Sequence, residues 1–409
     1  MTRFMALKRL NEIEPMLEKL YVELHQNPEL SMMELKTADR IEQLLEDFGY
    51  DTMKIGGGVV GILRNGEGPA VLFRADIDAL PVAEATNLEY ASTKTQKDRN
   101  GVVQPVMHAC GHDMHITAGI GAAWLLANSR DSWSGTYVAL FQPGEETAEG
   151  ARSMVADGVV EKVLAKIGKL DVAFGQHVLT EPAAGKVGTT AGPVLSTAAS
   201  LRITVTGKGS HGSMPHLGID PVLLASSIVT RLQGIVAREI APSQFGVVTV
   251  GSLQAGSQAN IIPNSATMLL NIRAYSNDVR NHLIDSIKRI AIAECEASGT
   301  PIPPEIEIYD EFPLTNNDAS VHENLRNAFI EYFGEDRVEH LDPVTASEDF
   351  SIVPDAFGVP YCYWGFGGFA EDQEKFPNHN PRFAPIMQPS LRTGTEAAAV
   401  AALSYLGKE

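Results

Sequence analysis

The sequence of 409 residues has few cysteines, few basic residues and no long apolar run. Its three cysteines, Cys110, Cys295 and Cys362, are far apart and form no Cys-x-x-Cys pair, which argues against a disulfide framework or a zinc ribbon. No apolar run reaches the roughly eighteen residues of a membrane-spanning helix. The N-terminal residues lack the apolar core of a signal peptide. We therefore expect a soluble, cytoplasmic protein.

Acidic residues outnumber basic residues in this chain. The 32 lysines and arginines face 51 acidic residues, which gives a net charge of -19 and a pI near 5.0. Nucleic acids and anionic membranes would be repelled by such a surface, so we expect neither as a partner. An apolar fraction of 44% is ordinary for a globular protein, and the length suits two domains. The chain has no internal repeat and no low-complexity tract.

One short segment is rich in side chains that bind metals. Met107 to His115 contains a thiol, three imidazoles and a carboxylate, which is typical of a metal site. His108 and His115 flank the central Cys-Gly-His, and we expect them to orient ligands or line the site. Three other histidines are interpreted as surface or hydrogen-bonded residues. These are His282, His322 and His340.

Two adjacent glutamates follow a strand-like run. The apolar residues 136–141 lead into Gln-Pro-Gly and then Glu145 and Glu146. Adjacent side chains of an extended segment point to opposite sides, so one glutamate could face a metal and the other a bound water. Paired glutamates are normally a solvated helix face, but an apolar strand followed by Pro-Gly makes that interpretation poor.

The first third of the chain alternates helix and strand patterns. Ser31 and Glu34 are interpreted as a capping box that opens a helix, residues 59–63 and 70–73 as strands, and residues 116–127 as an apolar helix. This alternation predicts an α/β domain whose mixed sheet is flanked by helices, with the chemistry at the strand ends.

The pattern changes from about Leu195. The predicted elements are strands at 201–205, 246–253 and 267–274 and helices at 221–239 and 278–297. Such a βαββα unit has enough residues for its own core. We therefore predict a smaller α+β domain at 194–304, inserted into a discontinuous catalytic domain of residues 1–193 and 305–409.

Several segments, in order along nearly the whole chain, resemble the M20 metallopeptidase family. They are residues 25–31 (HQNPELS), 74–81 (RADIDALP), 107–115, 142–146, 175–178, 207–216, 260–263 and 347–350. The resemblance is closer to the branch that holds aminoacylases, hippurate hydrolases and hydrolases of indoleacetyl-amino acids. Within that branch, the chain looks most similar to actinobacterial N-acyl-amino-acid aminoacylases, including those that act on Nα-acyl-glutamine.

The resemblance implies a catalytic domain with two divalent metal ions and a lid domain that also forms a homodimer. The positions that match the metal ligands are Cys110, His112, Glu146, His177 and His379. Zinc suits a thiolate ligand best, and manganese, cobalt and nickel are alternatives in this branch. By spacing alone His379 would be an unremarkable loop residue, and His177 a buried histidine at a strand end.

The resemblance also implies the reaction, which is hydrolysis of the amide bond of an N-acyl-L-amino acid. Glu145 matches the general base and acid, and Asp78 matches an aspartate that supports a metal ligand. His211 matches a lid histidine that stabilises the oxyanion in the active site of the partner subunit. Asn260 and Arg273 match residues that bind the substrate α-carboxylate, although Arg273 is equally consistent with a solvent-facing strand residue.

Three hypotheses remain open. The chain is an aminoacylase, or a metallo-dipeptidase or carboxypeptidase on the same scaffold, or a non-catalytic protein with a structural metal. Tolerance of a free α-amino group on the substrate separates the first two. The third is disfavoured because a structural site is normally closed by four ligands and needs no Glu145 beside them. Asp76, where distant branches have a histidine ligand, is not expected to bind metal. The aromatic segment 361–369 lines an acyl pocket or packs in the core.

Overall fold

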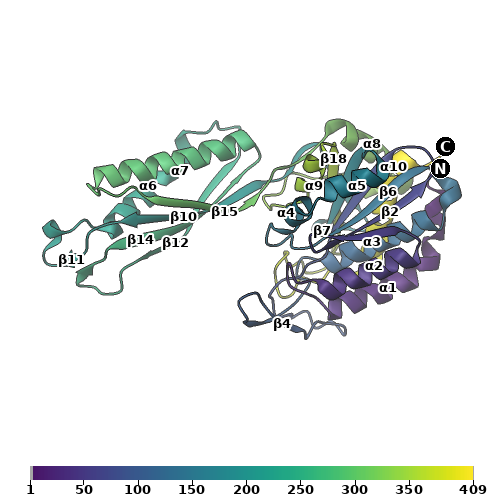
Figure 1. Cartoon of the computed structure of the whole chain (residues 1–409), viewed down its shortest axis with the longest axis horizontal. Helices are drawn as coiled ribbons and strands as arrows, with labels where there is room; N and C mark the ends of the chain where they lie inside the picture. The colour runs from purple at the N-terminus through teal and green to yellow at the C-terminus, as the bar shows by residue number, and fades with distance from the viewer. Residues whose placement is uncertain (1–2, 409) are drawn as a thin grey trace. The chain divides into compact units, whose positions relative to one another are not determined.

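The computed structural model describes residues 3–408, which divide into two compact units (Figure 1). The first unit comprises the chain up to Val194, Asn316–Pro343 and the chain from Asp349; the second comprises Leu195–Thr315 and Val344–Glu348. The predicted end of the inserted domain at residue 304 was wrong, because strand β15 (Glu305–Phe312) pairs with β10 (Thr197–Thr206) in the second unit.

A mixed sheet of eight strands forms the centre of the first unit. Its order is β1 (Asp51–Ile55), β2 (Gly58–Asn65), β6 (Gly135–Gln142), β3 (Ala70–Asp76), β7 (Val172–Ala184), β18 (Tyr361–Gly367), β8 (Val187–Thr189) and β17 (Val338–His340). Strand β3 is parallel to both of its neighbours, β6 and β7. Helices flank this sheet, which confirms the predicted α/β class.

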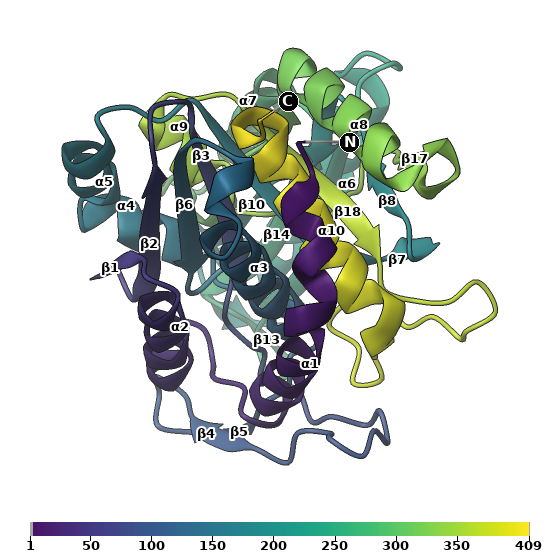
Figure 2. The same cartoon turned by 90° about the vertical axis from the view of Figure 1, so that its right-hand side faces the viewer.

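Helix α3 (His112–Ala127) is the apolar helix that the sequence predicts, but it begins at His112 rather than at Ile116. It is buried around nearly its whole circumference, because α1 (Leu10–Gln26), α10 (Met387–Leu406) and β3 pack against it (Figure 2). The candidate metal-ligand cluster therefore lies at the N-terminus of a helix that is packed in the core.

The remaining elements of the first unit are shorter or lie toward its surface. They are helices α2 (Leu35–Asp47), α4 (Gly150–Ala156), α5 (Val159–Ile167), α8 (Ala319–Phe333) and α9 (Ile352–Phe357), strands β4 (Thr95–Lys97), β5 (Val103–Pro105), β9 (Gly192–Leu195) and β16 (Thr315–Asn317), and 3-10 helices Met5–Arg9, Arg130–Ser132 and Glu335–Arg337. Among residues 3–408, no helix is both long and apolar enough to cross a bilayer.

Strand β18 carries most of the aromatic segment and packs in the core. All of its residues are buried, and the Trp364 ring lies 5.4 Å from the ring of Phe329 and 6.0 Å from that of Phe174. Tyr363 and Phe366 are likewise fully covered. Core packing, not an exposed acyl pocket, therefore accounts for these three side chains of the segment.

The second unit is an antiparallel sheet with two helices. The strand order is β12 (Gly246–Ala255), β14 (Ser265–Ala274), β10 and β15, and helices α6 (Pro221–Arg238) and α7 (Asn277–Ala297) pack together and against the sheet. Burial alternates along β14, and Asp220 caps α6 by accepting hydrogen bonds from two backbone N–H groups. The two-strand ribbon of β11 (Ser210–His211) and β13 (Ile261–Ile262) and the 3-10 helix Pro215–Leu217 complete the unit.

Candidate metal centre

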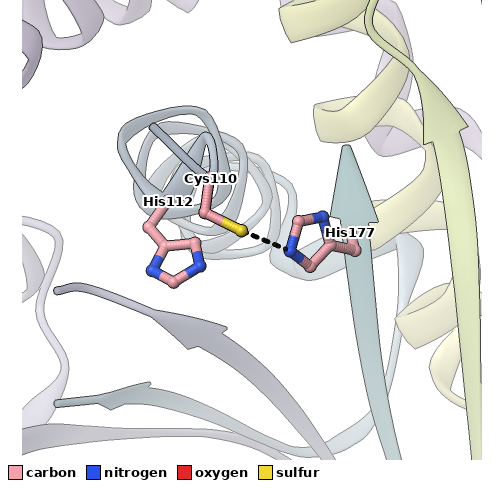
Figure 3. Close-up of side chains that lie close together, drawn as sticks. All are labelled: Cys110, His112 and His177. Carbon is pink, nitrogen blue, oxygen red and sulfur yellow. Dashed lines mark hydrogen bonds between the residues drawn. The ribbon is translucent and has the colours of Figure 1, made fainter. Parts of the chain in front are cut away.

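The turn before α3 brings a thiol and an imidazole to His177, which lies in the interior of strand β7 and not at a strand end. Gly111 has φ +81°, and a Cβ atom there would lie 2.4 Å from Cγ1 of Val178. Glycine is therefore required both for the left-handed backbone and for the close approach of β7. The consequence is that the Sγ atom of Cys110 lies 3.4 Å from Nε2 of His177, with His112 beside it (Figure 3).

Both imidazoles present the same nitrogen to this space. Nδ1 of His177 donates to the carbonyl oxygen of Val178 at 2.8 Å. Nδ1 of His112 lies 2.9 Å from the carbonyl oxygen of Asp78 and 3.1 Å from its Oδ1. Because these oxygens accept hydrogen bonds, both rings donate from Nδ1, which leaves Nε2 of each ring toward the site. Supports of this kind are typical of histidines that bind metals.

Glu145 and Glu146 lie in a turn after β6, not on an extended segment, so the argument from strand alternation was wrong. The backbone N–H of Glu146 donates to Oδ2 of Asp78 at 3.0 Å. Oε1 of Glu146 lies 3.9 Å from Nε2 of His112, and ligand atoms of His112, Glu145 and Glu146 all lie within 4.8 Å of one another. The turn still brings both carboxylates to the site.

A distant loop completes the cluster. Nε2 of His379 lies 3.1 Å from Oε2 of Glu146, and Nδ2 of Asn378 lies 3.3 Å from Sγ of Cys110. His379 has φ +69°, a conformation uncommon for a residue with a side chain, and its N–H donates to the carbonyl oxygen of Ala109. The Cys110 turn itself therefore anchors the backbone of His379.

The donor set fits cations. Among the described residues, Nε2 of His112 and Oε1 of Glu146 are buried atoms without a hydrogen-bond partner. Burial alone would lower the pKa of His112, but the carboxylates of Asp76 and Asp78 outweigh it and raise that pKa well above its ordinary value. Hydrogen bonds to Cys110 and Glu146 raise the pKa of His379 to about 10. The cluster thus attracts positive charge at two points.

The carboxylate of Asp76 is committed to other partners. Its Oδ1 accepts from Nδ1 of His115 at 2.6 Å, and its Oδ2 accepts from the guanidinium of Arg74 at 2.6 Å. Nε2 of His115 accepts from the N–H of Val178 at 2.8 Å, so this ring holds the peptide that follows His177. His115 therefore orients a candidate ligand, and Asp76 orients His115.

Ser31, the last residue of the HQNPELS segment, and Glu34, three residues further on, contribute to the site in a way that the sequence did not reveal. Helix α2 begins at Leu35 without a side-chain cap, so the prediction of a capping box was wrong. Oγ of Ser31 donates instead to Oδ2 of Asp78 at 2.6 Å, and Oε1 of Glu34 accepts from the N–H of Gly144 at 2.8 Å. Both residues support the turn that carries the paired glutamates.

The remaining candidate residues belong to the second unit. His211 pairs with Ile261 across β11 and β13, and the N–H of Gly212 donates to the carbonyl oxygen of Asn260, so the two candidates are close neighbours. Nδ1 of His211 lies 2.8 Å from Oγ of Ser213 and 3.2 Å from its backbone nitrogen, and the ring is exposed.

Arg273 lies on β14 of the same unit. Its Nη1 donates to Oγ of Ser347 at 2.5 Å and to the carbonyl oxygen of Thr345 at 3.3 Å, and its Nε donates to Asn271. The side chain is half-buried and already hydrogen-bonded, so the solvent-facing interpretation was wrong. These contacts leave its substrate role a prediction.

Comparison with known proteins gives matches over nearly the whole chain. The model of peptidase family M20/M25/M40 matches residues 72–404. Thermostable carboxypeptidase 2 of Saccharolobus solfataricus is 33% identical over 408 residues, 98% of each chain, and the hippurate hydrolase of Campylobacter jejuni is 34% identical over 90% of each chain. The crystal structure of a Bacillus subtilis protein, described as a dinuclear metal binding peptidase from the M20 family, superposes with a TM-score of 0.79 at 27% identity and covers 96% of this chain and 98% of its own.

Proposed function

The chain belongs to peptidase family M20/M25/M40 and is a metal-dependent amidohydrolase, and we propose that it hydrolyses N-acyl-L-amino acids to a carboxylic acid and a free amino acid. The cluster of thiol, imidazole and carboxylate groups beside a second carboxylate carries the proposal. The hippurate hydrolase among the relatives acts, by its name, on an N-acyl amino acid, which supports this substrate class.

Five side chains would hold two divalent ions. They are Cys110, His112, Glu146, His177 and His379. When bound, the ions supply Lewis acidity that polarises the amide carbonyl and lowers the pKa of water. A thiolate, three imidazoles and one carboxylate favour zinc, with manganese, cobalt and nickel as alternatives. The described dinuclear relative supports the number of ions.

Glu145 would move the proton. It is buried, and one of its carboxylate oxygens lies in the same cluster of atoms as an imidazole nitrogen of His112. A carboxylate there can take the proton of the attacking water and pass it to the leaving amine nitrogen. Glu146 would remain a ligand, because its own backbone is fixed through Asp78.

The second unit would supply the groups that bind the rest of the substrate. His211 has an exposed imidazole, which suits donation to an oxyanion. Asn260 is its close neighbour and Arg273 carries a guanidinium, so we propose that these two bind the substrate α-carboxylate. We also propose that this unit forms a homodimer. Exposed apolar side chains on α6 and β12 support that assembly, among them Leu223 at 67% exposure and Leu253 at 41%.

Replacement of Glu145 by Gln tests the assignment of the base. The amide keeps the size of the side chain but cannot take a proton, so we expect kcat for an N-acyl-amino acid to fall by about 100-fold or more with metal content unchanged. Glu149→Gln, an exposed carboxylate in the same loop, is the matched control. Full activity of Glu145→Gln would show that another group is the base.

A carboxypeptidase is the second candidate function. Its support is the 33% identity to a thermostable carboxypeptidase over 98% of both chains. The two functions differ in whether the substrate amide belongs to a peptide with a free α-amino group. Hydrolysis of matched dipeptides and N-acetylated amino acids by the metal-loaded protein separates them, and faster cleavage of the dipeptides would favour the carboxypeptidase.

A further inference from the structure

The first residue of the HQNPELS segment, His25, lies in the core between two carboxylates. Its Nδ1 is 2.6 Å from Oδ2 of Asp113, and its Nε2 is 3.1 Å from Oε1 of Glu84. All three side chains are buried, with exposures of 2%, 1% and 0%. The rings of Tyr21 and Tyr90 pack against the imidazole. None of the functional roles assigned above uses this group.

The contacts determine the protonation state of His25. An ionised carboxylate only accepts hydrogen bonds, so a ring with a carboxylate at each nitrogen donates from both and is an imidazolium. Burial alone would lower the pKa of His25, but the hydrogen bonds to Asp113 and Glu84 outweigh it and raise the pKa to about 10. Burial acts to raise the pKa values of both carboxyl groups, but the contacts with His25 contribute to holding them below the ordinary range.

The two carboxylates connect His25 to different parts of the candidate metal centre. Asp113 is in the first turn of α3, directly after His112. The Glu84 carboxylate accepts from the backbone N–H of Ser92 at 2.6 Å. Ala85, which directly follows Glu84, donates its backbone N–H to the carbonyl oxygen of Pro381 at 2.8 Å. Pro381 lies in the loop that carries His379.

We propose that the His25 imidazolium is a positioning residue that holds the Cys110–His112 turn and the His379 loop together in the arrangement that binds metal. The bridge joins segments that are far apart in sequence: α1, the first turn of α3, and the loop around Glu84. This proposal rests on the proposed metal-dependent function.

Zinc release from the reconstituted full-length protein to a chromophoric chelator tests the proposal. In His25→Gln the positive charge is lost, and a glutamine that donates to one carboxylate turns its oxygen toward the other. We expect zinc to leave about tenfold faster than from the wild type. His322→Gln is the matched control, since His322 is a half-buried histidine on α8 whose Nε2 has no hydrogen-bond partner among residues 3–408. It should release zinc at the wild-type rate.

A second variant guards against a folding defect. Glu84→Gln keeps the contact between His25 and Asp113 and weakens only the connection toward the His379 loop, so we expect a smaller acceleration of zinc release. Thermal unfolding of the metal-free proteins, followed by circular dichroism, separates global stability from metal retention. Wild-type release rates in a folded His25→Gln or in Glu84→Gln would overturn the proposal, and wild-type protein that retains no zinc would overturn the proposed function as well.

Discussion

The support that Asp78 gives to both sides of the metal centre leads to a quantitative prediction for Asp78→Asn. Oδ1 lies 3.1 Å from Nδ1 of His112, and Oδ2 accepts from Oγ of Ser31 at 2.6 Å and from the N–H of Glu146 at 3.0 Å. An asparagine that keeps its oxygen toward Ser31 and Glu146 turns its NH2 group toward Nδ1–H of His112. Two donors then face each other.

The magnitude follows from which contacts survive. The backbone carbonyl oxygen of Asp78 still accepts from Nδ1 of His112 at 2.9 Å, so the ring retains one partner that fixes its tautomer. Loss of a support to a metal-binding histidine weakens metal affinity by about 10-fold to 100-fold. This range corresponds to roughly 1.4–2.8 kcal/mol. Because one support remains, we expect a value near the lower end.

Competition with a zinc chelator measures the affinity directly, and kcat/KM at saturating zinc shows whether activity recovers when the metal is replaced. Asp157→Asn is the matched control, because this exposed carboxylate also accepts a backbone N–H, that of Gly56 at 2.8 Å. Wild-type zinc affinity in Asp78→Asn would refute the inferred support of His112.

Three further predictions concern the Cys110 turn and the buried thiol of Cys362. Gly111→Ala places a Cβ 2.4 Å from Val178 at φ +81°, so we expect it to reduce the free energy of unfolding, measured by urea denaturation, by about 2–4 kcal/mol. Gly101 has the same φ but open space around it, so Gly101→Ala should reduce the free energy of unfolding by only about 1 kcal/mol. Equal losses in the two variants would contradict the steric argument. Cys110 should be alkylated faster in metal-free than in zinc-loaded protein by mass spectrometry. Cys362 should stay unreactive at pH 8 because burial raises its pKa to about 12, and its alkylation in folded protein would contradict this.

The elements that the sequence predicted well are those whose apolar pattern reports burial directly. Strands β2, β3 and β6 and the helices of the second unit lie where their patterns place them. The start of α3 could not be read in this way, because its first turn is polar. His112 and Asp113 are buried there through contacts with Asp78 and His25, residues that are distant in sequence.

The misinterpreted features have a common physical cause. Ser31 and Glu34 have the spacing of a capping box, but Oγ of Ser31 donates to Asp78, and Oε1 of Glu34 accepts from the N–H of distant Gly144 as well as from that of nearby Met32. The pairing of β15 with β10, which moved the domain boundary, is also a long-range contact. Local spacing predicts local hydrogen bonds, and here tertiary partners competed successfully for the same side chains.

The central claim is that metal held by the Cys110 cluster enables amide hydrolysis. The most direct measurement is product formation from a panel of N-acyl-L-amino acids by protein stripped with a chelator and then reconstituted with increasing zinc. We predict no hydrolysis by the stripped protein and recovery that is complete at two ions per chain. Undiminished hydrolysis by protein shown by elemental analysis to be metal-free would contradict the claim.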